Sequence, residues 1–143
     1  MKILRVNMKE ASLKWEPVPK EYEQVGGRAL IAKLLLKEIP PACDALGPHN
    51  KLIFTPGLLG GAMVATAGRL SVGAKSPLTR GIKEANAGGT SGDALGKLGI
   101  KAISDDFSIP DILGDRAIYR CHGTCRIPQL VPKLLSTLYQ FRI

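Results

Sequence analysis

The sequence predicts an α+β domain, in which short strands and short helices share one core. Three observations support this prediction. Residues 2–8 alternate apolar and polar side chains, as a half-buried strand does. Residues 21–39 carry apolar side chains at helical spacing. Residues 57–99 hold eleven of the sixteen glycines, a density that favours loops and close backbone approach over long helices.

The first half of the chain predicts a hairpin followed by a helix. The strand at 2–8 is followed by a turn at 9–10 and a returning strand at 13–17. The apolar spacing over 21–39 predicts a helix that a Pro-Pro pair ends. Because a Gly-Gly pair weakens its first turn, the regular helix is expected to begin near Arg28.

Shorter elements follow in the glycine-rich half. They are strands at 52–55, 70–74 and 100–103, and a helix at 93–98. Thr90 or Ser91 is placed to cap this helix. Ser104, Asp105 and Asp106 are polar where the last strand would continue, so the strand is expected to end at residue 103.

Length, charge and composition limit the classes of function. The chain has 143 residues, enough for one domain with a modest core, and a net charge of +8. This charge favours an anionic partner, although a merely basic surface is an equal alternative. Aromatic residues make up only 5%, which leaves little for base stacking and disfavours nucleic acid. With no apolar run of about 18 residues and no signal-like N-terminus, the expected location is the cytoplasm, without a membrane partner.

The strongest chemical signal is the turn Asn-Ala-Gly-Gly-Thr-Ser-Gly at residues 86–92, ahead of a predicted helix. Glycines let backbone N–H groups approach a ligand, and a helix N-terminus adds donors and a favourable dipole for an anion. The spacing fits neither a Walker loop nor the dinucleotide fingerprint. Taken alone, the segment is consistent with either a structural turn or a phosphate cradle.

Other polar residues carry weaker signals. Arg69 precedes a predicted strand and could act as a fork-shaped donor to a phosphate or a ring carbonyl, or as a solvated charge at the strand edge. Lys75 and Arg80 flank a turn and are expected to be solvated. Cys121, His122 and Cys125 offer three soft ligands without an evident fourth, so a metal site is disfavoured there. An odd number of cysteines argues against a disulfide framework.

A series of motifs in residues 2–103 resembles the N-terminal domain of the tungsten-containing aldehyde ferredoxin oxidoreductases. They include Gly-Gly-Arg-Ala-Leu at 26–30, Ala-Lys-Ser-Pro-Leu-Thr at 74–79 and Ala-Asn-Ala-Gly-Gly at 85–89. Further matching segments lie at 3–7, 35–41, 50–54, 57–60, 68–69 and 97–102. Their order and spacing are similar to those of the family, which makes the resemblance much stronger than any one motif.

The resemblance implies a fold, cofactors and site residues. It implies an α+β domain whose mixed β-sheets and short helices form a base under the pterins, of which this chain holds about half. It implies tungsten, or molybdenum, bound by two pyranopterins with magnesium. It also implies a 4Fe-4S cluster that this chain does not ligate, an aldehyde substrate and ferredoxin as partner. Arg69 would contact a pterin, Gly88 would bind one through its backbone, and Asn86 would contribute to the magnesium site, for which an amide oxygen is a suitable ligand.

Beyond residue 103 the resemblance stops. Residues 104–143 are interpreted as an unmatched basic tail, non-native or disordered, of a truncated or frameshifted copy. The leading hypothesis is therefore an N-terminal fragment of an oxidoreductase that converts aldehydes to carboxylic acids, with no catalytic residue of its own. The alternative is a stand-alone module that binds a pterin or another phosphorylated ligand without catalysis. A homo-oligomer is compatible with either hypothesis.

Overall fold

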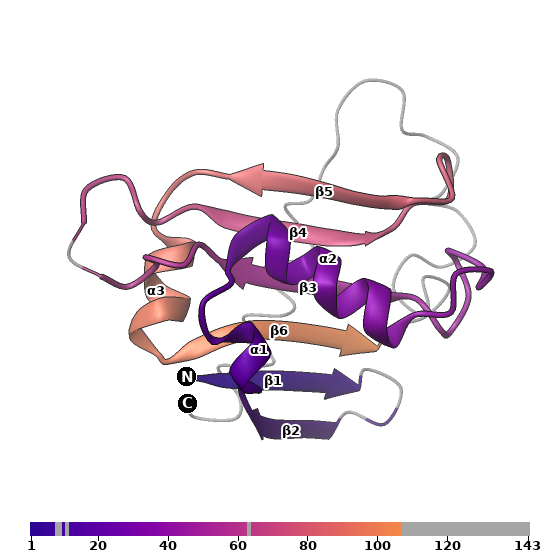
Figure 1. The fold of residues 1–143 in the computed structure, drawn as a ribbon, viewed down its shortest axis with the longest axis horizontal. Helices are drawn as coiled ribbons and strands as arrows, with labels where there is room; N and C mark the ends of the chain where they lie inside the picture. Colours follow the sequence, from indigo (N-terminus) through magenta and orange to yellow (C-terminus); the bar gives the residue numbers. More distant parts are fainter. Residues whose placement is uncertain (8–9, 11, 63, 107–143) are drawn as a thin grey trace. The chain divides into compact units, whose positions relative to one another are not determined.

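The computed structural model describes residues 1–7, 10, 12–62 and 64–106. Figure 1 shows the helices and strands of this part of the chain. The strands are β1 (Lys2–Asn7), β2 (Ser12–Pro17), β3 (Lys51–Pro56), β4 (Leu70–Lys75), β5 (Ile82–Ala87) and β6 (Ile100–Asp106). The helices are α1 (Lys20–Glu23), α2 (Gly27–Glu38) and α3 (Ser91–Lys97).

The described strands form one six-stranded sheet in the order β2-β1-β6-β3-β4-β5. β1 and β6 are parallel, and every other neighbouring pair is antiparallel. The sheet is therefore mixed, and the α+β prediction is confirmed. The predicted hairpin is also present, since β1 pairs with β2 from Lys2 opposite Pro17 to Asn7 opposite Ser12.

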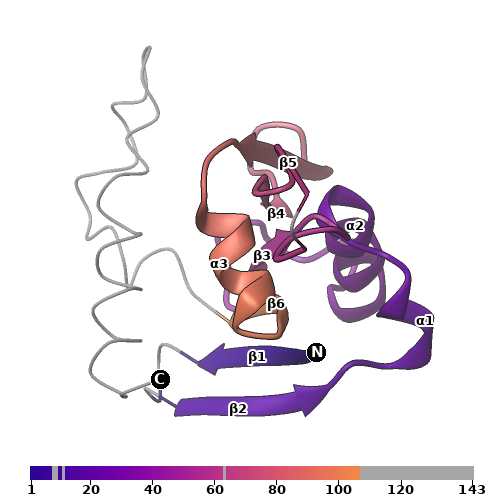
Figure 2. The ribbon, with the colours of Figure 1, turned by 90° about the vertical axis from the view of Figure 1, so that its left-hand side faces the viewer.

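The core lies between α2 and one face of the sheet. Figures 1 and 2 place α1 and α2 on the same side of the strands. Four apolar residues of α2 are fully or almost fully buried: Leu30, Ile31, Leu34 and Leu35. They pack in one cluster with Ile3, Ile53 and Ala102 from three neighbouring central strands. These residues form two adjacent pairs four positions apart, which is the helical spacing that predicts the helix from the sequence.

The helical segment is divided, where the sequence predicts one helix over 21–39. A short α1 ends at Glu23, and α2 begins at Gly27, one residue before the expected Arg28. Gly27 has a φ of 55°, a conformation that glycine adopts without the steric cost of a side chain. The Gly-Gly pair thus interrupts the helical periodicity completely.

One strand and one strand boundary also differ from the prediction, since no strand was expected over 82–87. Asn86 and Ala87 belong to β5, although the sequence places them in a loop. β6 continues through Ser104 and Asp105 to Asp106, where polar side chains predict its end. β5 lies at the sheet edge with nearly all its residues exposed, so it lacks the alternation that marks a half-buried strand. β6 lies inside the sheet, where backbone pairing with both neighbours extends it regardless of side-chain polarity.

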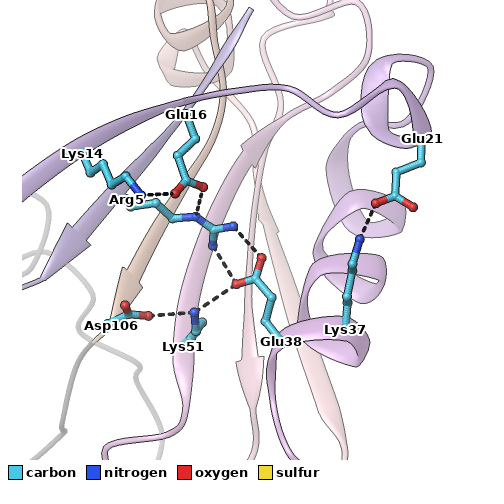
Figure 3. Close-up of polar contacts among 8 residues, drawn as sticks. All are labelled: Arg5, Lys14, Glu16, Glu21, Lys37, Glu38, Lys51 and Asp106. Carbon is cyan, nitrogen blue, oxygen red and sulfur yellow. Dashed lines mark hydrogen bonds and ion pairs between the residues drawn. The ribbon is translucent and has the colours of Figure 1, made fainter.

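A network of ion pairs joins the end of α2 to three central strands (Figure 3). Arg5 donates two hydrogen bonds of 2.6 Å to the carboxylate of Glu38, and Lys51 Nζ donates one of 3.0 Å. Lys51 also pairs with Asp106, and Arg5 with Glu16. Burial alone would raise the pKa of Glu38, but these hydrogen bonds outweigh it and hold the pKa below its ordinary value.

Asp105 lies in an unfavourable environment within the sheet. Its side chain is 1% exposed and is flanked in the register by Val6 of β1 and Leu52 of β3. Its Oδ1 has no hydrogen-bond partner among the described residues. Burial raises the pKa of Asp105 to about 7, and the neighbouring charge of Asp106 adds to the effect.

We expect Glu38→Ala to destabilise the fold, because it leaves Arg5 and Lys51 half-buried without their counter-charge. The free energy of unfolding should fall by about 2 kcal/mol, as for other charge-assisted hydrogen bonds. Chemical denaturation measures it. Glu21→Ala is the matched control, because Glu21 pairs with Lys37 at 2.6 Å on the exposed surface and should contribute little. Equal losses in the two variants would contradict the structural role of the buried network.

We expect the stability of the chain to fall between about pH 4 and pH 7 through Asp105. The pKa of Asp105 is raised in the folded state, so folding favours its protonated form. The resulting gain in the free energy of unfolding is fully present below the unfolded pKa and is lost as the pH rises to about 7. Each unit of pKa shift corresponds to about 1.4 kcal/mol. Asp105→Asn should remove this slope in denaturation curves recorded from pH 4 to pH 8. An unchanged slope in the variant would exclude Asp105 as its source.

Candidate functional site

The register of the sheet brings the three predicted site residues to one corner. Leu70 at the start of β4 pairs with Ala87 at the end of β5. Arg69 immediately precedes Leu70 and Gly88 immediately follows Ala87, so both lie just beyond the paired part of the two strands. Asn86 lies in the next pair of the ladder, opposite Ser71. This corner is the left-hand end of the upper strands in Figure 1, where β5 leads into α3.

The turn after β5 leaves its backbone uncovered. A side-chain carbon built on Gly88 or Gly89 would meet no heavy atom within 4 Å, and both residues are exposed. Gly89 has a φ of 121°, which residues with a side chain rarely adopt. The space next to this backbone is therefore open to a ligand. A cradle of this kind fits the approach of a pterin or phosphate group to backbone N–H donors.

The other glycines of this region have a packing role. A side-chain carbon on Gly96 would lie 2.0 Å from the carbonyl oxygen of Gly60, and one on Gly92 would lie 2.5 Å from that of Arg69. The loop before β4 thus rests directly on the backbone of α3. Gly92 N–H donates to Gly68 O at 3.0 Å. One donor of the α3 N-terminus is consequently used within the fold, and α3 contributes less to anion binding than the sequence predicts.

Arg69 is exposed and forms no ion pair with any described residue. Its guanidinium is therefore available beside the open turn for a planar or anionic group. Lys75 differs, because its Nζ donates to the carbonyl oxygens of Pro41 and Cys43 at 2.5 and 2.6 Å. The prediction of a solvated Lys75 is wrong, since it anchors a loop. Arg80 is exposed, as predicted.

Asn86 has two side-chain partners that sequence reasoning missed. Ser71 Oγ donates to Asn86 Oδ1 at 2.5 Å, and Asn86 Nδ2 donates to Glu84 Oε2 at 2.8 Å. Glu84 Oε1 lies 3.8 Å from Arg28 Nη1 at the start of α2. Residues two apart on a strand share a face, so the spacing of Glu84 and Asn86 would have revealed the contact once β5 was recognised.

A hollow of about 610 Å³ lies at the opposite end of the sheet. The cations that line it, Arg5, Lys14 and Lys51, are each paired with a carboxylate among the described residues. This hollow therefore presents less free positive charge than the corner at Arg69.

Metal ligands of the usual kinds do not gather in the described part of the chain. No group of three His, Cys, Asp or Glu side chains there could hold a metal ion. Cys43 is a free, partly buried thiol. Cys121, His122 and Cys125, with the rest of the predicted tail from residue 107, lie outside the described residues. No described helix has the length and apolar character needed to cross a membrane.

Comparison with known proteins identifies the domain. The family model for the N-terminal domain of aldehyde ferredoxin oxidoreductase matches residues 3–104. The chain belongs to the aldehyde ferredoxin oxidoreductase family. The match confirms the resemblance seen in the motifs, and it ends within β6, two residues before that strand does.

Named relatives agree with this assignment. Tungsten-containing aldehyde ferredoxin oxidoreductases of Thermococcus kodakarensis and Pyrococcus furiosus are 45% and 42% identical over 104 residues, or 71% of this chain. The chain spans only 17% of the length of these relatives. In structure it is similar to the active-site complex BamBC of benzoyl coenzyme A reductase, with a TM-score of 0.68 and 29% identity. That likeness covers 73% of this chain and 16% of the other.

We expect Gly88→Ala to leave stability unchanged and to weaken ligand binding. The new methyl group meets nothing in the folded chain but occupies space beside the exposed backbone. Gly96→Ala should instead destabilise the domain, because its methyl group would overlap the Gly60 carbonyl. Thermal denaturation and titration with inorganic pyrophosphate measure the two effects. A loss of stability in Gly88→Ala, or normal stability in Gly96→Ala, would contradict the assignment of open and packed glycines.

Proposed function

We propose that this chain forms one wall of a tungstopterin site in an oxidoreductase that converts aldehydes to carboxylic acids with ferredoxin as electron acceptor. The observation that carries the proposal is the corner at the ends of β4 and β5. There an uncovered glycine turn, an unpaired arginine and an exposed amide lie together. The names of the curated relatives support tungsten, aldehyde and ferredoxin as the chemistry.

The three residues would have separate roles. Arg69 would bind a pterin through its fork of N–H donors, and Gly88 would bind one through its backbone. Asn86 Oδ1 would serve as a ligand to a magnesium ion bound with the cofactor. The tungsten or molybdenum, when bound, supplies the redox chemistry. A 4Fe-4S cluster would be held by segments other than this chain, since a thiolate cluster needs several cysteines together.

This wall would hold the cofactor and leave the choice of substrate to other segments. The similar BamBC structure is named for benzoyl coenzyme A reductase and contains 1,5-dienoyl-CoA. Its name and those of the aldehyde ferredoxin oxidoreductases indicate different substrates for proteins that share this domain. What these proteins would share through this domain is the cofactor, whereas their substrates differ.

A second function is a binding module for a pterin or another phosphorylated ligand, without catalysis. The observation that favours it is that all three proposed site residues lie at one corner of this domain. Loading with tungstate and measurement of aldehyde-dependent electron transfer separate the two. Bound pterin with no electron transfer supports the module.

We expect Arg69→Gln to lower the tungsten and pterin content of the chain expressed in a host that makes the cofactor. Metal analysis and the fluorescence of oxidised pterin measure the content, which should fall several-fold with the loss of a charged donor. Arg80→Gln is the matched control, because it removes the same charge at the far end of the β4–β5 pair. An equal fall in both variants would show that net charge, not Arg69, retains the cofactor.

A further inference from the structure

The Asn86 carboxamide is held from both sides by groups on the same face of the sheet. Ser71 lies opposite it on β4, and Glu84 lies two residues earlier on β5. Both hydrogen bonds are short, at 2.5 and 2.8 Å. Ser71 is only 4% exposed, so its hydroxyl cannot readily turn to bulk water instead. Asn86 itself is exposed.

The chemistry of these partners fixes which way the carboxamide faces. An ionised carboxylate only accepts hydrogen bonds, so the Asn86 group beside Glu84 must be the NH₂. The amide oxygen then faces Ser71, whose hydroxyl donates to one of its two lone pairs. The other lone pair remains for a ligand. Without Glu84, the carboxamide could rotate and present NH₂ in place of oxygen.

Glu84 is itself placed by its surroundings. It lies opposite Gly73 in the register, and the Ile31 side chain of α2 fills the space over Gly73. Its other oxygen lies 3.8 Å from Arg28 at the start of α2. The packing of α2 on the sheet is thereby connected to the orientation of Asn86. A carboxylate this close also adds attraction for a cation that Asn86 would bind.

We infer that Ser71 and Glu84 are positioning residues that hold the Asn86 oxygen ready for a hard divalent cation. The inference rests on the proposed function, in which Asn86 is a ligand to a cation bound to phosphates. It adds two residues to the site that touch neither the cofactor nor the substrate. Their role is to set the orientation of one amide and the local charge.

The test uses the full chain and inorganic pyrophosphate as a probe, titrated with and without Mn²⁺. Pyrophosphate alone reports on Arg69 and the glycine turn, and the gain from Mn²⁺ reports on Asn86. Ser71→Ala and Glu84→Ala should each reduce the Mn²⁺-dependent gain about fivefold, the effect of one hydrogen bond. Binding of pyrophosphate alone should not fall. Ser71→Thr and Glu84→Gln retain a hydroxyl and an acceptor, and should keep most of the gain.

Each result separates this inference from the function on which it rests. If Asn86→Ala keeps the full Mn²⁺ gain, or the unaltered chain shows none, the cation site is wrong and the positioning role fails with it. If Asn86→Ala loses the gain but Ser71→Ala and Glu84→Ala keep it, only the positioning role is overturned. If these two variants also lose binding of pyrophosphate alone, their effect is on folding and the inference is likewise overturned.

Discussion

The fold depends on the insertion of β6 between β1 and β3. This strand is the last described element of the chain, yet it lies inside the sheet and joins the β1–β2 hairpin to the three antiparallel strands β3, β4 and β5. Ala102 contributes to the core beneath α2, and Lys101 Nζ donates to Glu23 O of α1. Without β6, strands β1 and β3 would each lack a hydrogen-bonded neighbour, and that neighbour comes from a distant part of the sequence. Such pairing between distant segments carries a loop-closure cost that only the finished core offsets.

The end of β6 shows a conflict between backbone pairing and side-chain chemistry. The family match ends at Ser104, and the next residue is a carboxylate between two apolar neighbours. At Asp106 the chemistry is favourable again, since its carboxylate pairs with Lys51. The two acids therefore act on stability in opposite directions. Asp106 completes the network that anchors α2, whereas Asp105 would be better accommodated as a neutral group.

Local patterns predicted the elements that have one covered face. The alternation of β1 and the spacing of α2 are direct consequences of a buried and an exposed side, and both elements were found where expected. The edge strand β5 and the inner strand β6 lack that asymmetry, so β5 was missed and the end of β6 was placed too early. Within the site, Arg69, Asn86 and Gly88 could be named from motifs. Ser71 could not, because its contact with Asn86 depends on a cross-strand register that no local pattern encodes. Glu84 was missed because its contact follows from the spacing only once β5 is recognised as a strand.

The site and the core are connected through the start of α2. Thr55 of β3 donates to the Gly27 carbonyl at 2.9 Å, and Ser71 Oγ would lie 3.3 Å from a side-chain carbon on Gly27. A side chain at residue 27 would press on the serine that contacts Asn86. The Gly-Gly pair therefore does more than interrupt a helix: it lets α2 begin against β4 without displacing the site. The corner is thus connected to the core through Ser71, which contacts Asn86 and lies against the start of α2.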